Sequence, residues 1–214
     1  TAAGTTDVFA RRVPPTGSLG PVWQITTNED VESSPAVLAT GDTWLTAFTT
    51  DNGSASDIVT YGLDPSDPIG ATQNNVTLDA ADDGAPRLFD AGAGSVLLWH
   101  RPSLASASST RLDAFGDPVS ALVPVDAMTT FSEAPSVFDR GTAGPAAFFL
   151  SGLNTIQMLP LTSSGVVDSA ASPATIVAPG ATNRLAFSRA GTSSRLFIGA
   201  TSSISSAALG TNGS

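Results

Sequence analysis

A period of about 50 residues recurs along this chain, and it constrains the fold more than any other feature. The segment DVFARRV at residues 7–13 aligns with DIVTYGL at 57–63, and weaker copies begin near Ser109, Asn154 and Ser203. Self-similarity at a fixed period of this length is typical of solenoids, propellers and repeat arrays. The strands of this chain therefore have to be assigned repeat by repeat.

A second motif recurs in phase with the first. SPAVL at 34–38 matches APRLF at 85–89 and APSVF at 134–138, and NRLAF at 183–187 matches less well. An aromatic residue follows each motif at nearly the same distance inside an apolar run: Phe48, Trp99, Phe149 and Phe197. Since a large ring fills the gap between packed sheets, we expect these aromatic residues to form the core between neighbouring units.

Each period contains four short segments that read as strands bounded by turn residues. In the second period they are residues 57–63, 75–79, 86–90 and 95–101, whereas the Ser/Ala-rich run 103–109 reads as a flexible loop. Four antiparallel strands per 45 to 52 residues are typical of a β-propeller blade. The chain is therefore predicted to be all-β, a β-propeller of four-stranded antiparallel blades; a β-sandwich is the alternative.

The repeats predict one propeller domain over residues 1–214. Its repeats are 5–53, 54–104, 105–153 and 154–202, followed by a strand or tail at 203–214. Four blades are favoured and five are possible, because an outer pair near the N-terminus could complete an inner pair near the C-terminus. The segment 203–209 would compete with 7–13 for the same edge. An excerpt of a longer array, a terminal tail and a fifth irregular unit all remain open.

The composition excludes several classes of chemistry. The 214 residues include no Cys, no Lys and a single His, His100, so disulfides, thiolate zinc sites, cysteine nucleophiles and multi-histidine metal centres are ruled out within the chain. Nine Arg against 19 acids give a net charge of −10, which makes nucleic acid an improbable partner. No apolar run is long enough for a membrane helix, so membrane insertion is not expected.

Four segments in the first 50 residues resemble a known repeat. DVFARRV at 7–13, GPVWQITT at 20–27, SSPAV at 33–37 and WLTAF at 44–48 are similar to a repeat family of large secreted or surface proteins of bacteria. That family reads D-[IV]-[YF]-x-x-R-V … [FW]-Q-I-[NT]-T … S-P-x-V and is associated with β-propellers. The resemblance implies an extracellular or cell-surface propeller whose signal peptide has been removed. The D-x-D-x-D-G loop of calcium-binding propeller repeats does not occur.

Candidate site residues gather in the loops that we expect at one face of the propeller. They precede the inner strands or follow the second strands: Glu29, Asp30, Glu32, Asp51, Asp82, Asp83, His100, Arg101 and Glu133. Carboxylates around an axis could bind a cation such as calcium or accept hydrogen bonds from sugar hydroxyls. The same acids are also common turn residues, which is the favoured interpretation. Paired carboxylates for glycoside hydrolysis are conceivable.

No catalytic constellation stands out from the sequence. The leading hypothesis is a non-enzymatic extracellular binding or adhesion module whose ligand is a carbohydrate or a surface protein. The alternative is a structural spacer within a larger surface appendage or assembly, and a glycan-active hydrolase comes third. No catalytic residue, bound metal or cofactor is predicted, apart from a weak possibility of calcium.

Overall fold

The computed structural model describes residues 5–14, 16–41, 43–64, 66, 72–92, 94–125, 135–140, 144–150, 155–168, 170, 174–177, 181–190, 193–200 and 204–209. Within these ranges every regular element is a β-strand except one 3₁₀ turn, Pro102–Leu104. None of the described residues forms a helix that is long and apolar enough to cross a membrane. The all-β prediction is therefore confirmed.

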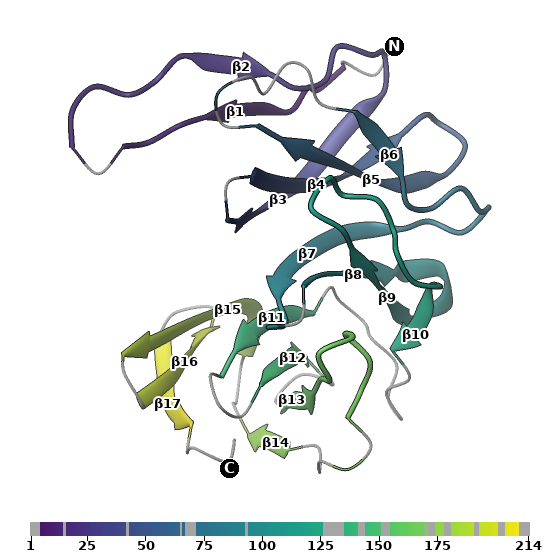
Figure 1. The fold of residues 1–214 in the computed structure, drawn as a ribbon. Coiled ribbons are helices and arrows are strands. Elements are labelled where there is room, and N and C mark those ends of the chain that lie inside the picture. The colour runs from purple at the N-terminus through teal and green to yellow at the C-terminus, as the bar shows by residue number, and fades with distance from the viewer. Residues whose placement is uncertain are drawn as a thin grey trace.

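The strands form five antiparallel sheets that follow one another along the chain (Figure 1). The first sheet pairs β1 (Phe9–Arg11) with β2 (Val22–Gln24). The next two have four strands each: β3 (Val31–Thr40), β4 (Thr43–Asp51), β5 (Ser56–Leu63) and β6 (Gln73–Asn75), then β7 (Gly84–Asp90), β8 (Ser95–Arg101), β9 (Ser106–Leu112) and β10 (Val123–Val125).

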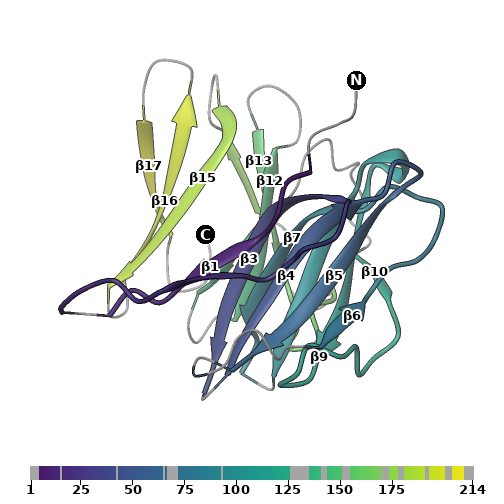
Figure 2. The ribbon, with the colours of Figure 1, turned by 90° about the horizontal axis from the view of Figure 1, so that it is seen from above.

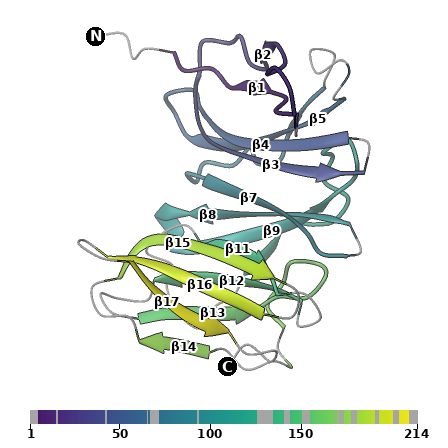
Figure 3. The ribbon, with the colours of Figure 1, turned by 90° about the vertical axis from the view of Figure 1, so that its left-hand side faces the viewer.

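The remaining two sheets complete the series. One contains β11 (Ser136–Asp139), β12 (Pro145–Leu150), β13 (Thr155–Pro160) and β14 (Ala174–Val177), and the other contains β15 (Ala181–Ala190), β16 (Ser193–Ala200) and β17 (Ile204–Leu209). Each sequence repeat thus supplies the outer two strands of one sheet and the inner two strands of the next. The sheets lie face to face in a propeller-like array, which Figures 2 and 3 show from two further directions.

Two local predictions are wrong. A strand was expected at residues 75–79, but β6 is Gln73–Asn75 and ends where the predicted strand begins. The run 103–109 was expected to be a loop, but β9 begins at Ser106 and pairs with β8 over its whole length. Ser106–Leu112 carries few residues of high strand propensity, yet Ala107, Ser108 and Ser109 are buried between sheets. Their small side chains fit there because Trp99, opposite Ser108, fills much of the available space.

The inner strands of the second and third sheets share a bulge. Ser34 and Ala85 have positive φ values of 54° and 50°, and each is followed by a proline. The register of β3 with β4 shifts between Ser33 and Ala36, and that of β7 with β8 shifts between Gly84 and Arg87. The S-P and A-P motifs therefore encode a bulge that bends each inner strand where it leaves the loop.

Neighbouring sheets pack through the second strand of each sheet, because successive side chains of a strand point to opposite faces. The buried contacts are Leu45 and Ala47 of β4 with Leu97 and Trp99 of β8, then Val96 and Leu98 of β8 with Ala147 and Phe149 of β12, then Ala146 and Phe148 of β12 with Leu196 and Ile198 of β16. The predicted aromatic core is confirmed at Phe48, Trp99 and Phe149, which are almost fully buried, while Phe197 is half-buried.

The first and last sheets do not join in the described part of the chain. β1 pairs with β2 alone, and β17 occupies the edge of β16 that β1 was expected to take. The competition predicted between segments 203–209 and 7–13 is thus resolved in favour of the C-terminal strand. The predicted closure by these two segments is not formed, and the choice between four and five blades stays a prediction.

Candidate functional site

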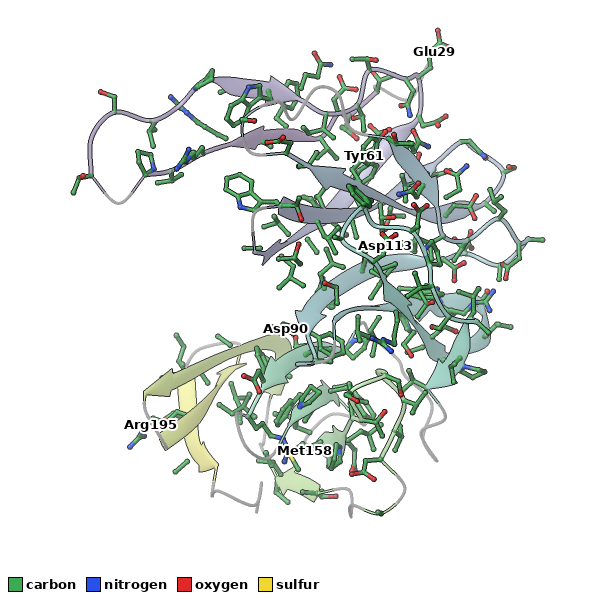
Figure 4. All side chains as sticks on the ribbon, in the orientation of Figure 1. Glu29, Tyr61, Asp90, Asp113, Met158 and Arg195 are labelled. Carbon is green, nitrogen blue, oxygen red and sulfur yellow. The ribbon has the colours of Figure 1, made fainter. Side chains whose placement is uncertain are left out.

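The loops before the inner strands and after the second strands lie at the same end of the sheets, as predicted. Val31 at the start of β3 pairs with Asp51 at the end of β4, and Gly84 at the start of β7 pairs with His100 near the end of β8. Figure 4 shows Glu29 at this end, on the loop before β3. Glu133 lies outside the described residues.

Asp83 is the centre of one cluster at this end. Its side chain is buried, with the residue 1% exposed, and Oδ1 accepts a hydrogen bond of 3.0 Å from Nε1 of Trp99. Nε of Arg101 lies 2.9 Å from the same oxygen, and the guanidinium also contacts Asp79. Burial raises the pKa of Asp83, while Arg101 and the Trp99 hydrogen bond act in the opposite direction. The cluster is thus a buried carboxylate with a charged partner.

Glu32 occupies the corresponding place one sheet earlier. It is 5% exposed, and its Oε2 accepts a hydrogen bond of 3.2 Å from Oγ1 of Thr26. Its other oxygen, Oε1, is buried and has no hydrogen-bond partner among the described residues. Burial is the main cause that raises the pKa of Glu32, and the negative charges of Asp7 and Asp30 raise it further, while the side chains of Thr26 and Asn28 act in the opposite direction. This carboxyl group therefore favours its protonated form more than a carboxyl group in water does.

The two clusters are built on one repeated arrangement. Oγ1 of Thr26 accepts a hydrogen bond of 2.9 Å from the backbone of Val8, and Oγ1 of Thr77 accepts one of 2.8 Å from Ile58. Thr77 also donates to Asp57, the repeat counterpart of Asp7. In both sheets a threonine after the fourth strand thus binds the third strand and donates to an acid, which is Glu32 of the next sheet for Thr26 and Asp57 of the third strand itself for Thr77.

Asp30 shares the face of Glu32. Glu32 lies directly opposite Thr50 in the β3–β4 pair, and opposite residues of an antiparallel pair project to the same face. Oγ1 of Thr50 donates a hydrogen bond of 3.4 Å to Oδ2 of Asp30, which brings this carboxylate to that face. Since Asp30 also raises the pKa of Glu32 by its charge, the two carboxyl groups lie within electrostatic reach of each other.

The other predicted site residues have simpler surroundings. Asp51 accepts a hydrogen bond of 2.7 Å from the backbone of Gly53, and Asp82 accepts one of 3.3 Å from that of Ser56. Both are therefore turn and loop residues, in agreement with the favoured interpretation of the sequence. His100 is buried, and Glu29 is exposed. No three His, Asp or Glu side chains within the described ranges are placed to hold a metal ion together.

Sequence reasoning missed several partners of these acids: Asp7, Thr26, Thr77, Asp79 and the indole N–H of Trp99. The repeat contained a signal for two of them, since Thr26 and Thr77 precede Glu32 and Asp83 by the same interval. Asp79 could not be found in this way, because the corresponding position of the first repeat is not acidic.

A groove lies on the face of the second sheet that is turned toward β1, further along β3 from Glu32. Its volume is about 540 Å³, and it lies between β1 and the inner strands of the second sheet. Representative lining residues are Phe9, Arg11, Pro35, Val37, Trp44 and Thr46. The groove is mainly apolar, with Arg11 as its charged side chain.

Comparison with known proteins gives structural likeness alone. No family model and no curated protein matches the sequence. One similar solved structure is an α-L-arabinofuranosidase from Podospora anserina in complex with cellotriose, with a TM-score of 0.56 and 12% identity; it covers 85% of this chain and 61% of that one. An α-L-arabinofuranosidase from Lactobacillus brevis has a TM-score of 0.57 and 12% identity, with 84% and 70% covered. The chain thus spans about three fifths of the first enzyme.

These comparisons correct the functional prediction. The sequence was interpreted as a non-enzymatic binding or adhesion module, but the two similar structures named above are enzymes. The likeness to these enzymes could not be found from the sequence, because the identity is 12% and neither a family model nor a curated protein matches. The expectation of a structural spacer stays a prediction, as does the resemblance to the bacterial surface repeat.

Proposed function

We propose that this chain is a glycan-active enzyme that cleaves a glycosidic bond at the loop face where β3 begins. Glu32 is the proton donor and Asp30 is the second carboxylate. The observation that carries the proposal is the Glu32 carboxyl group, whose pKa is raised and whose Oε1 is unpaired, beside Asp30 on one face. The fold likeness to two α-L-arabinofuranosidases supports this choice of reaction class.

The two carboxyl groups have the properties that glycoside hydrolysis requires. A general acid must hold its proton near neutral pH, and burial together with negative neighbours is the usual way to raise a carboxyl pKa. Glu32 donates its proton to the glycosidic oxygen as the bond between this oxygen and the anomeric carbon breaks. Asp30, half-exposed and held by Thr50, accepts a proton from the water that attacks the anomeric carbon.

The substrate class follows from charge and from the comparisons. A surface with a net charge of −10 repels anionic polysaccharides, so a neutral glycan is the better substrate. The first comparison enzyme acts on arabinofuranosides and was crystallised with a glucose oligosaccharide. We therefore propose a neutral plant-type polysaccharide with arabinose side groups, and secretion as the condition under which the protein meets it.

Hydrolysis assays with the full chain test this proposal. The substrates are 4-nitrophenyl α-L-arabinofuranoside and arabinoxylan, followed by chromatography of the released sugars. The Glu32→Gln variant keeps the size of the side chain and removes the acidic proton, so kcat is expected to fall by about 100-fold or more. Asp30→Asn is expected to cause a similar loss.

Asp51→Asn serves as the matched control, since Asp51 lies at the same end and only closes a turn. It is expected to retain the activity of the wild type. Circular dichroism melts show whether each variant is folded. Absence of hydrolysis by the folded wild type on both substrates would overturn the proposal, and full activity of Glu32→Gln would overturn the assignment of Glu32.

A further inference from the structure

The strand β1 has a free edge. Val8 O accepts a hydrogen bond from Ile25 N, and Arg12 O accepts one from Gly20 N, so these residues direct their backbone toward β2. Because backbone groups of a strand alternate between its two sides, Phe9 and Arg11 direct theirs to the opposite side. Among the described strands none pairs with β1 there.

The sheet face beside this edge is also uncovered. Val37 of the inner strand β3 is 67% exposed and Phe9 is 57% exposed. Both line the groove of about 540 Å³, together with Trp44 and Thr46 of β4. The groove thus combines an unpaired strand edge on one wall with an apolar sheet face on the other.

The junctions between the later sheets show what covers the equivalent face there. Leu97 and Trp99 of β8 occupy the repeat positions of Thr46 and Phe48 in β4, and they are covered by Leu45 and Ala47 of the preceding second strand. The same contact recurs between Val96 and Leu98 of β8 and the next sheet. The described first sheet contains only β1 and β2, which correspond to the third and fourth strands of the other sheets. No described strand of that sheet corresponds to the second strand that covers this face at the later junctions.

We propose that this groove binds a β-hairpin of the same repeat type. The second strand of the hairpin adds antiparallel to the free edge of β1, and its alternating apolar residues cover Val37 and Trp44. This is β-strand addition, in which backbone hydrogen bonds provide affinity and alternate side chains provide specificity. The groove lies beyond the proposed hydrolytic residues on the same face, and the inference does not depend on that activity.

Residues 84–101 of this chain, as a synthetic peptide, are a suitable probe. They form the β7–β8 hairpin, and their two Arg and one Asp give the peptide a net positive charge that complements the acidic chain. Fluorescence anisotropy of the labelled peptide, titrated with the full 214-residue chain, measures binding. We expect saturable binding.

Two variants of the chain test the two walls of the groove separately. Phe9→Pro removes an N–H that β2 does not use, so it blocks strand addition while leaving the β1–β2 pair in place. Val37→Glu places a charge on the exposed face without disturbing a buried residue. Each is expected to weaken peptide binding by about tenfold or more, whereas Phe9→Ser, which keeps the N–H, weakens it less than Phe9→Pro.

The control peptide carries Val96→Ser and Leu98→Ser, which remove the apolar residues expected to enter the groove. Equal binding of the control peptide overturns the proposal, as does binding that neither chain variant weakens. Absence of saturable binding by the folded wild type overturns it as well. Dimerisation of the chain alone that Phe9→Pro abolishes would assign the groove to a second copy instead and would also refute the hairpin.

Discussion

Two junctions of this molecule place an acid at the same repeat position but give it different partners. Asp83, between the second and third sheets, has an indole N–H and the guanidinium of Arg101 beside it. Glu32, between the first and second sheets, has the hydroxyl of Thr26 and the side chain of Asn28 beside it, and no cation among the described residues. Burial raises the pKa of both, so the difference lies in what compensates their charge. The two repeats therefore share the backbone position and the burial of this acid, but they differ in the groups that compensate its charge.

This difference separates an acid whose charge has a cationic partner from an acid whose charge has none. Asp83 is part of a packed core between two complete sheets, where a charged partner makes its burial tolerable. Glu32 lies beside the two-stranded first sheet, and no cation compensates its charge within the described ranges. A buried oxygen without a hydrogen-bond partner is common to both acids, Oε1 in Glu32 and Oδ2 in Asp83. Substitutions at the two junctions should accordingly have effects of different size and of opposite sign.

Removal of the cation at the Asp83 junction is expected to have the largest effect. Arg101→Ala leaves Asp83 buried without its charged partner, which typically costs about 3 to 5 kcal/mol of unfolding free energy. Urea unfolding at neutral pH measures the change. Arg12→Ala, at an exposed arginine, is the control and is expected to change stability by less than about 0.5 kcal/mol. A loss below about 1 kcal/mol for Arg101→Ala would show that Asp83 does not rely on this ion pair.

Removal of the indole donor comes next in size. Trp99→Phe keeps an aromatic ring in the core and deletes the hydrogen bond to Asp83, with an expected loss of about 1 to 2 kcal/mol. The repeat offers a natural counterpart, because Phe48 stands at this position one sheet earlier. A double-mutant cycle with Asp83→Asn should show coupling between the two changes, and additive losses would contradict the contact.

At the Glu32 junction the sign should reverse. Glu32→Gln removes a buried charge that has no cationic partner, so the unfolding free energy is expected to rise by about 0.5 to 1 kcal/mol. The same variant is expected to lose glycan hydrolysis, which is the usual opposition between stability and activity at a functional site. If Glu32→Gln were as destabilising as Arg101→Ala, the contrast between the two junctions would disappear.

The smallest effect is the pH dependence of that gain. The pKa of Glu32 in the folded chain lies above its ordinary value of 4.5, so the folded state holds this proton more tightly than the unfolded state. The destabilising effect of the charge is present above the folded pKa and disappears as the pH falls toward 4.5. The difference between Glu32→Gln and the wild type should thus shrink between pH 7 and pH 4.5, as urea midpoints can show. A constant difference would contradict the raised pKa.

The repeat predicted much of the fold for a physical reason. Period, turn residues and alternating apolar residues are local signals, and they located β5, β7 and β8 nearly to their ends. The run at 103–109 was misread because its strand is set by packing beside Trp99 and not by its own propensity. Positions of the loop acids could be predicted, but their partners could not, since Trp99 and Arg101 were visible as a core residue and a loop cation without any indication of Asp83 between them.

The proline that follows the bulge in the inner strands has a consequence for the behaviour of the protein at high concentration. β3 and β7 lie at the edges of their sheets, and Pro35 and Pro86 offer no N–H to an approaching chain. A proline on an edge strand is a common safeguard against the growth of intermolecular sheets. β1 contains no proline within Phe9–Arg11. Aggregation of this chain is therefore expected to start at an edge strand without proline, such as β1, and not at β3 or β7.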